Sequence, residues 1–313
     1  MTSSNNINKL ELQDLQLAES LKKITLHKLI AEKANIADLI EKESRSERIK
    51  ICGSMLNFLK ERNIVTDEVR RRLVKANFCK YRFCPMCQWR MARKVCREVL
   101  GRLRTINEAH NGVALLFLTL TIKNEPLTEL NSTVKHLSKA FYRMQQSKQY
   151  KCAVLGSIRA IEFLGDNTEK GECHPHFHCL LVVNKSYFKY RDYINFEEWT
   201  ALWQRSLRVD YRPILNVQRV KPKGKMSAII AAALEVVKYS VTSSDLEKLS
   251  KEDFQELDKQ TRNIRQYNYS GELKDAEPTF DDIEDESLWE LLEEEYFQWS
   301  HGKYSKREFN RTV

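Results

Sequence analysis

A run of alternating histidines constrains the fold of this chain more than any other stretch. His174, His176 and His178 are spaced two residues apart, and aliphatic residues follow at positions 180–183. Because successive side chains of a strand point to opposite faces, we predict a strand with the three imidazoles on one face and Phe177 on the other. Imidazoles that converge from one strand suit divalent transition metals, so the run predicts a metal site. A purely structural role for these histidines is the alternative.

Positive charge is concentrated in the first part of the chain. The 313 residues carry a formal charge of +9, but residues 247–313 contain 10 Lys+Arg and 18 Asp+Glu. Residues 1–246 therefore carry +17, and the remainder −8. A strongly basic body beside an acidic segment is typical of proteins that bind nucleic acids.

The apolar stretches and the cysteines indicate the compartment. The longest apolar run, Val113–Ile122, is shorter than a membrane-spanning helix. Residues 1–6 lack the basic and apolar parts of a secretory signal. We therefore expect a cytoplasmic protein with no membrane partner, whose eight cysteines are thiols or metal ligands rather than disulfides.

Three cysteines around a proline-containing turn predict a structural Zn²⁺ site. Cys84 and Cys87 enclose a Pro-Met turn that presents two thiolates to one ion, and Cys79 can add a third. A structural zinc ion needs a fourth ligand, and the nearest candidates are Cys52 and Cys96. We favour Cys52, because a neighbouring glycine indicates a break in the chain, whereas Cys96 lies in a predicted helix and is reached only by folding back. Buried cysteines without metal are the alternative.

Basic side chains surround the cysteines. Residues 60–104 contain 14 Lys+Arg against 4 Asp+Glu, with aromatic residues interleaved, and a second basic loop occupies 221–225. Arginine and lysine bind phosphates and aromatic rings stack on bases, so both stretches predict DNA contact. A merely solvated charged face is the alternative. The predicted DNA-binding residues are Arg82, Arg90, Arg93, Lys94, Lys221 and Lys223.

Apolar spacing predicts the remaining elements. Residues 8–60 have leucines and isoleucines at roughly helical intervals, which predicts helices that pack or self-associate. Ala153–Phe163 is a predicted strand that leads into the histidine run, and we expect the two to pair antiparallel. Glu162 then lies close enough to add a carboxylate to the metal site, although a charge at a strand edge is an equal alternative. Other predicted elements are strands at Val113–Ile122 and Val217–Val220 and helices at Trp89–Leu103, Leu130–Gln145, Phe196–Ser206 and Met226–Ser240.

The last of these helices carries a tyrosine with charged neighbours. Glu235 and Tyr239 are four residues apart and share a helix face, with Lys238 one position round. On spacing alone, a packed amphipathic helix explains them. The composition then changes, and twelve acidic residues between Glu272 and Glu295 predict an extended or loosely helical tract.

Taken in order, these motifs resemble those of rolling-circle plasmid replication initiators. Phe117–Thr121, the His174–His178 run and the Glu235-x-x-x-Tyr239 pair follow the order of the endonuclease superfamily named for a His–hydrophobe–His motif (HUH endonucleases). The Cys79–Cys87 block looks like that of a Gram-positive plasmid branch. The resemblance covers about residues 50–245.

The resemblance implies an α+β fold with an antiparallel sheet of about five strands flanked by helices. The metal would lie on the central strands and the tyrosine on an adjoining helix. We expect four regions: an N-terminal helical region (1–60), a basic zinc- and DNA-binding region (61–108), the endonuclease domain (109–246) and an acidic C-terminal region (247–313).

The resemblance also implies a metal centre that binds Mg²⁺ or Mn²⁺. In that family, two histidines of the motif are ligands, which are His176 and His178 here. A carboxylate or third imidazole completes the set; Glu162 or His174 can fill the place, and we favour Glu162.

The same resemblance makes Tyr239 the nucleophile. Its attack on a DNA phosphate would leave a free 3′-hydroxyl and a 5′-phosphotyrosyl bond. A phenol with a pKa near 10 needs help at neutral pH, which Lys238 can give. Glu235 would act as general base on a water at termination.

The implied partners are plasmid origin DNA, recognised as a hairpin with a single-stranded nick site, and the helicase and replication polymerase of a bacterial host. Formation of a homodimer is left open. A transposase or conjugative relaxase would use the same chemistry. A non-catalytic zinc-containing DNA-binding regulator is the second alternative, and it leaves the histidines and the tyrosine unused.

Overall fold

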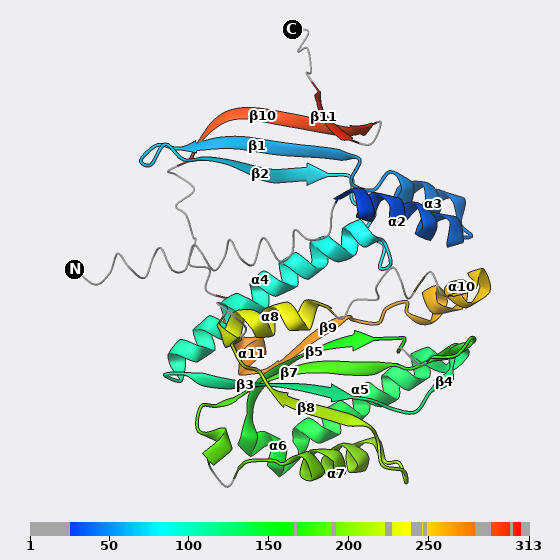
Figure 1. Cartoon of the computed structure of the whole chain (residues 1–313), viewed down its shortest axis with the longest axis vertical. Helices are drawn as coiled ribbons and strands as arrows, with labels where there is room; N and C mark the ends of the chain where they lie inside the picture. Colours follow the sequence, from blue (N-terminus) through cyan, green and yellow to red (C-terminus); the bar gives the residue numbers. More distant parts are fainter. Residues whose placement is uncertain are drawn as a thin grey trace. The chain divides into compact units, whose positions relative to one another are not determined.

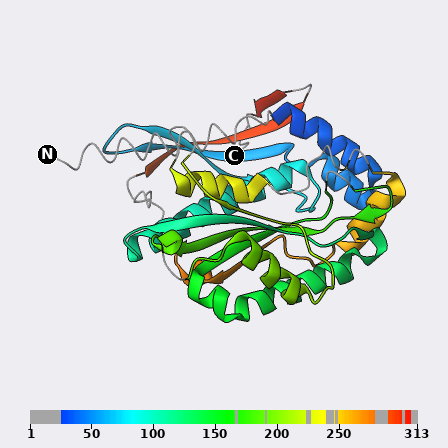
Figure 2. The same cartoon turned by 60° about the horizontal axis from the view of Figure 1, so that its bottom comes forward.

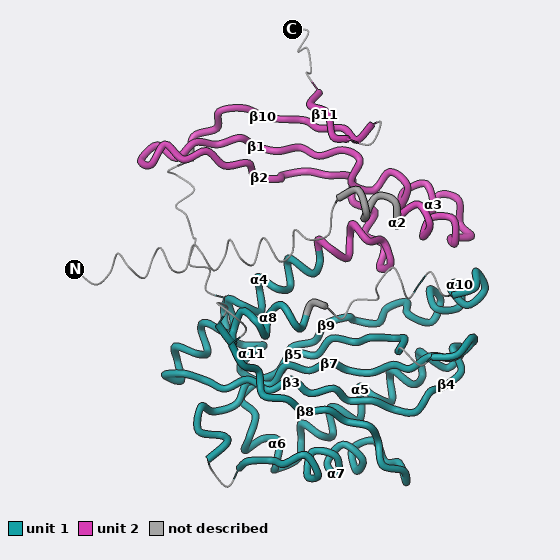
Figure 3. Tube along the Cα trace, in the orientation of Figure 1, with its two compact units in different colours: residues 1–23, 91–279 teal, residues 24–90, 280–313 magenta. Residues whose placement is uncertain are grey.

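The computed structural model divides the chain into two compact units, coloured in Figure 3. The structure describes residues 26–165, 168–189, 192–222, 227–238, 246, 249–278, 289–300 and 303–307. Among these, unit 1 comprises the residues from 91 to 279, and unit 2 comprises those from 24 to 90 and from 280 onward. This division differs from the four regions expected from the sequence, because the acidic region 247–313 is shared between both units.

Unit 1 is built on a five-stranded sheet with the strand order β8-β3-β7-β5-β9 (Figure 1). Every neighbouring pair in this sheet is antiparallel. The α+β class and the antiparallel sheet expected from the sequence are therefore confirmed. The strands are β3 (Val113–Leu120), β5 (Val154–Glu162), β7 (His176–Asn184), β8 (Leu215–Arg219) and β9 (Tyr267–Gly271).

Strand β7 is the central strand, and it is buried from His176 to Val183. A central strand that is covered on both faces favours continuous apolar residues, which accounts for the aliphatic run after the histidines. Strand β5 pairs with it antiparallel, as predicted, with Glu162 opposite His176 and Ala160 opposite His178. Residues directly opposite on paired strands share a face, so the carboxylate and both imidazoles project from the same side of the sheet.

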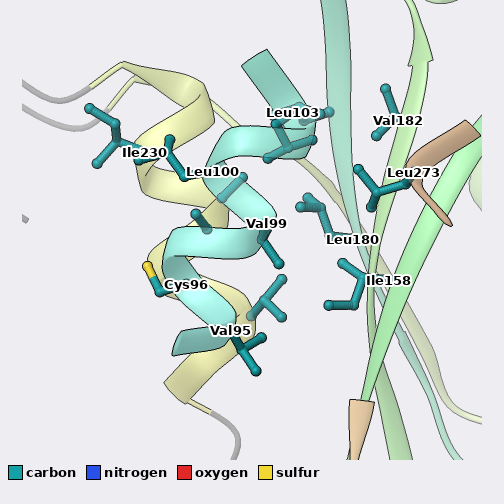
Figure 4. Close-up of a cluster of buried hydrophobic side chains, with 14 of the residues drawn as sticks. Val95, Cys96, Val99, Leu100, Leu103, Ile158, Leu180, Val182, Ile230 and Leu273 are labelled. Atoms are coloured by element: carbon teal, nitrogen blue, oxygen red, sulfur yellow. The ribbon is translucent and has the colours of Figure 1, made fainter. Parts of the chain in front are cut away.

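Helices cover both faces of this sheet (Figures 1 and 2). On the histidine face, residues of helices α4 and α8 pack with Ile158, Leu180 and Val182 in one buried apolar cluster (Figure 4). On the other face, the ring of Phe141 in α5 lies edge-on to the ring of Phe177, with centroids 6.0 Å apart. The helices are α4 (Pro85–Ala109), α5 (Leu130–Gln146), α6 (Lys148–Ala153), α7 (Phe196–Leu207) and α8 (Ala228–Lys238).

Shorter elements complete unit 1. They include a two-stranded sheet of β4 with β6 and a turn of helix, α11, that follows the edge strand β9. Among the described residues, no helix combines the length and the apolar character needed to span a membrane. These elements are β4 (Glu125–Pro126), η1 (Leu127–Glu129), β6 (Glu172–Cys173), η2 (Tyr187–Lys189), α10 (Lys251–Gln260) and α11 (Glu272–Asp275).

Unit 2 combines two helices with a four-stranded antiparallel sheet in the order β11-β10-β1-β2. The helices are α2 (Leu26–Leu39) and α3 (Glu43–Lys50), and the strands are β1 (Met55–Asn63), β2 (Val69–Ala76), β10 (Trp289–Ser300) and β11 (Lys303–Arg307).

The structure corrects one prediction about the N-terminal helices and specifies another about the acidic tract. The predicted N-terminal helices end at Lys50, and the stretch from Met55 to Asn63 is a strand. Of the acidic tract, predicted to be extended or loosely helical, residues 272–275 form the helical turn α11 and the residues from 289 onward are extended as strand β10. Glu295 of β10 pairs with Arg71 of β2 at 2.6 Å. In the same sheet, Glu61 of β1 pairs with Arg70 and Arg72 of β2, each at 2.8 Å.

Candidate functional site

Glu162, His176 and His178 form one cluster on the central strands of unit 1. Their ligand atoms all lie within 4.8 Å of one another. Oε2 of Glu162 is 3.1 Å from Nε2 of His176 and 2.9 Å from Nε2 of His178. Two imidazole nitrogens and one carboxylate oxygen are a donor set that suits a divalent metal ion.

Contacts behind the two rings fix their orientation. Nδ1 of His176 lies 2.8 Å from the carbonyl oxygen of His174. A carbonyl only accepts, so this nitrogen carries a proton and donates. The contact holds the ring so that its other nitrogen, Nε2, faces the Glu162 carboxylate. Nδ1 of His178 is 3.3 Å from Oγ1 of Thr119, which lies opposite it on strand β3.

Burial and mutual charge set the ionisation of this cluster. Burial raises the pKa of Glu162, but hydrogen bonds from His176 and His178 outweigh it and bring the value to about 2. Burial lowers the pKa of His178, and Glu162 only partly offsets this effect. A carboxylate that is ionised beside an imidazole that stays neutral provides the protonation states that a metal ion requires.

His174 does not join this group. Strand β7 begins at His176, so His174 precedes the strand and the regular alternation predicted for three histidines covers only two. Its ring centroid lies 5.3 Å from that of His176, and its carbonyl supports the His176 ring. The structure therefore brings the carboxylate of Glu162, rather than the ring of His174, to both imidazoles.

Helix α8 brings a second carboxylate to the histidine face. Glu235 is half-buried in α8, and its charge raises the pKa of His178, which places it within electrostatic reach of the cluster. Lys238 is the last described residue of this helix, and nothing is described of its side chain. Tyr239 lies outside the described residues.

Cys52, Cys79, Cys84 and Cys87 form a second cluster, in unit 2. Their four sulfur atoms lie within 4.8 Å of one another, and the sulfur of Cys87 is 3.6 Å from those of both Cys52 and Cys79. Tetrahedral Zn–S bonds of about 2.3 Å require sulfur separations of about 3.8 Å. The geometry therefore fits a four-cysteine zinc site. Pro85 opens helix α4 between two of the ligands, a position where its missing N–H costs nothing.

Backbone N–H donors and a buried ammonium lie beside these thiols. The N–H groups of Cys79 and Lys80 donate to the sulfurs of Cys52 and Cys87, at 3.3 and 3.2 Å. The ammonium of Lys33 is buried and donates to the carbonyl of Cys52 at 2.8 Å. Burial lowers the pKa of Lys33, and the charge of Cys52 opposes that effect. We did not predict a role for Lys33; the available signal was a lysine on the apolar stripe of a helix.

Cys96, the alternative fourth ligand, lies elsewhere. It belongs to the part of α4 in unit 1, and its side chain is buried in the apolar cluster with Ile230 (Figure 4). Burial raises the pKa of its thiol to about 12. A protonated thiol among aliphatic side chains is a packed core residue.

The predicted DNA-binding residues are mostly exposed. Arg90, in unit 2, lies over the ring of Phe78 at 4.7 Å, and Arg82 is half-buried. In unit 1, Arg93 and Lys94 are exposed on α4, and Lys221 is exposed after β8. Lys223 lies outside the described residues.

Comparisons with known proteins identify the family. A family model described as "Replication protein" matches residues 70–308. A "Protein rep" from Streptococcus pneumoniae is 35% identical over 237 residues, which are 75% of this chain and 71% of the relative. Another "Protein rep", from Lentilactobacillus hilgardii, is 33% identical over 278 residues, 83% of this chain and 86% of the relative. No solved structure gives a significant match. The chain therefore belongs to the replication-protein family of the Rep initiators, in agreement with the resemblance of its motifs to Gram-positive rolling-circle plasmid initiators.

Proposed function

We propose that this protein initiates rolling-circle replication of a plasmid by nicking one strand of its origin. The observation that carries the proposal is the convergence of Glu162, His176 and His178 on one face of the sheet, under the helix that leads to Tyr239. Membership of the replication-protein family favours initiation over transposition or conjugative transfer. A non-catalytic regulator has no use for this cluster.

Glu162, His176 and His178 are the residues that would hold the catalytic ion. A bound Mg²⁺ or Mn²⁺ supplies Lewis-acid polarisation of the scissile phosphate and offsets its developing charge. The chain itself supplies the nucleophile. The Tyr239 oxygen forms a bond to phosphorus, the bond from phosphorus to the 3′-oxygen breaks, and the leaving oxygen takes up a proton as a 3′-hydroxyl. Lys238 would stabilise the phenolate form of Tyr239.

Glu235 would serve the termination step. Its carboxylate lies within electrostatic reach of His178 and can accept a proton from a water that attacks the phosphotyrosyl bond. Replacement of Glu235 by alanine should leave nicking intact and slow release of the protein from DNA. Equal loss of both steps in this variant would contradict a role confined to termination.

The four cysteines would hold a structural Zn²⁺ ion, and the exposed basic residues of α4 would contact origin DNA. The free 3′-hydroxyl would then prime a host polymerase, while a host helicase unwinds the duplex.

A covalent-adduct assay tests the proposal. Labelled single-stranded origin DNA is incubated with the protein and Mn²⁺ and resolved on a denaturing gel. A protein–DNA band should form, and it should be absent in Tyr239→Phe and His176→Ala. Tyr142→Phe is the matched control, because Tyr142 is 62% exposed on helix α5. A band that persists in Tyr239→Phe would refute the assignment, and tight metal-independent DNA binding without any band would favour the regulator.

A further inference from the structure

Unit 1 has a basic pocket on the sheet face opposite the histidines. The pocket has a volume of about 570 Å³ and lies between helix α5, strand β5 and the segment that joins α10 to β9. Glu162 and Ala160 share the histidine face, so Arg159 projects from the opposite one. None of the pocket's lining residues is acidic. Five of them are basic: Lys135, Lys139, Arg159, Arg262 and Arg265.

Arg159 is held in place without a carboxylate. Its guanidinium lies 4.1 Å from the ring centroid of Phe177, and its Nη2 donates to Oγ of Ser138 at 3.2 Å. Burial lowers the pKa of this guanidinium, and the neighbouring Cys179 thiol opposes that effect. Among the described residues, no carboxylate forms an ion pair with Arg159. An arginine has five N–H donors, so several remain to serve a ligand in the pocket.

The segment that joins α10 to β9 forms the wall of the pocket opposite α5, and hydrogen bonds fix it at both ends. The amide side chain of Asn131 donates to the carbonyl of Gln260 at 2.8 Å, and the backbone N–H of Asn131 donates to Oε1 of Gln260 at 3.1 Å. The carbonyl of Gln266 accepts from the N–H of Ile161 at 3.0 Å. Arg262 and Arg265 lie between these anchors. Within the described part of the chain, Arg262 pairs with Asp258 at 3.4 Å, whereas Lys135, Lys139 and Arg265 have no ion-pair partner.

Several cations without counter-ions around one pocket repel one another, and the partly buried Arg159 bears a desolvation cost as well. An anion removes both penalties. Guanidinium, ammonium and amide donors together are the groups that recognise phosphate oxygens. A pocket of this volume is in the range of small-molecule sites.

We propose that this pocket is a phosphate-binding site, distinct from the metal centre, that takes the phosphate groups of a nucleotide or of a DNA strand. Its position on the far face of the sheet separates it from the nicking chemistry. Its occupation does not require the proposed nuclease activity, so the two can fail independently.

Calorimetric titration without added divalent cations tests this site, with dATP and an oligothymidylate without origin sequence as the two probes. The test variant is Lys139→Ala/Arg265→Ala, which removes two exposed charges and leaves Arg159 packed on Phe177. The matched control is Lys148→Ala/Lys151→Ala, which removes two exposed charges of helix α6 that do not line the pocket.

For at least one probe, we expect affinity to fall at least about tenfold in the pocket variant and to be unchanged in the control. A selective loss of dATP binding identifies a nucleotide site, and a selective loss of oligothymidylate binding identifies a contact to the DNA backbone. The proposal is overturned if neither probe binds, or if pocket and control variants bind both probes equally. Arg159→Lys, which keeps the charge but loses the forked donors, should weaken binding as well.

Discussion

At the scale of single residues, one carboxylate oxygen links the cluster of Glu162, His176 and His178. Oε2 of Glu162 is the atom closest to both imidazoles, at 2.9 and 3.1 Å from their Nε2 atoms. With a pKa of about 2, the carboxyl is ionised throughout the range in which the protein would work. Its charge would therefore contribute to the proposed metal affinity at any physiological pH.

Replacing Glu162 by glutamine should weaken Mn²⁺ binding. The amide has nearly the same shape but lacks the negative charge, so we expect affinity to fall about tenfold or more. The measurement is calorimetric titration with Mn²⁺. Glu197→Gln is the matched control, because Glu197 pairs with Arg212 on the exposed surface of α7. Equal affinities in Glu162→Gln and the unchanged protein would remove Glu162 from the ligand set.

Substitution of Cys52 and of Cys96 tests which of the two is the fourth zinc ligand. Cys52→Ser should reduce the zinc content well below one ion per chain, because it removes a sulfur within 3.6 Å of Cys87. Cys96→Ala should retain the zinc and cost on the order of 1 kcal/mol of unfolding free energy through lost packing. Metal analysis of the purified proteins measures the first effect, and denaturant unfolding measures the second. Zinc loss in Cys96→Ala alone would reverse the assignment.

At the scale of elements, local pattern predicted much of unit 1 and little of unit 2. Strand β7 has alternating histidines and an apolar run, and its partner β5 follows the same logic, so both strands and the place of Glu162 were predictable. Strand β1 contains two leucines together with Met, Lys, Glu and Arg, which all favour helices, so it resembles a helix when considered alone. Its strand form depends on pairing with β10, more than 200 residues away, which no local pattern reveals. Thr119 was equally ambiguous, because its role depends on a neighbouring strand.

The ion pairs of the unit 2 sheet should make its stability depend on pH. Hydrogen bonds from Arg72 and Arg71 hold the pKa values of Glu61 and Glu295 below the ordinary value near 4.5. Their stabilisation is therefore complete above that value and is lost as pH falls through the lowered folded-state pKa. Glu295→Gln should lower the melting temperature at pH 7 by several degrees and flatten its decline in acid. Thermal scans between pH 3 and 7 measure this.

Glu290→Gln in the same strand is the control. Glu290 pairs with Arg62 at 3.0 Å, but its side chain is 54% exposed, so solvent screens the pair. The Glu290→Gln variant should have the same melting temperature as the unchanged protein at every pH. If the melting temperature of Glu295→Gln declined in acid as steeply as that of the unchanged protein, the pairing of Glu295 with Arg71 would be excluded as the source of the decline.

At the scale of the whole molecule, the chain contributes to the two units alternately. Unit 2 is assembled from residues 24–90 and from residues after 279, so its sheet pairs strands that are far apart in the sequence. Unit 1 takes its edge strand β9 and helix α11 from the region that the sequence suggested was a separate acidic tail. Residues beyond 245 are therefore parts of both folds rather than an appendage to them.

A chain ended after Asp245 should consequently fail to fold. Such a chain could not be used to measure how the acidic residues affect DNA binding, because its fold would be lost as well. It lacks β9, which covers the edge of β5, and α11, whose Leu273 carbonyl accepts from Arg102. It also lacks β10 and β11, including Tyr304, whose hydroxyl donates to the carbonyl of Gly53 beside Cys52. We expect a loss of the cooperative thermal transition and reduced zinc content.

A chain ended after Arg307 is the control. It keeps every described strand and should melt within a few degrees of the full chain. Cooperative unfolding and full zinc content in the chain ended after Asp245 would show instead that each unit folds without its C-terminal strands.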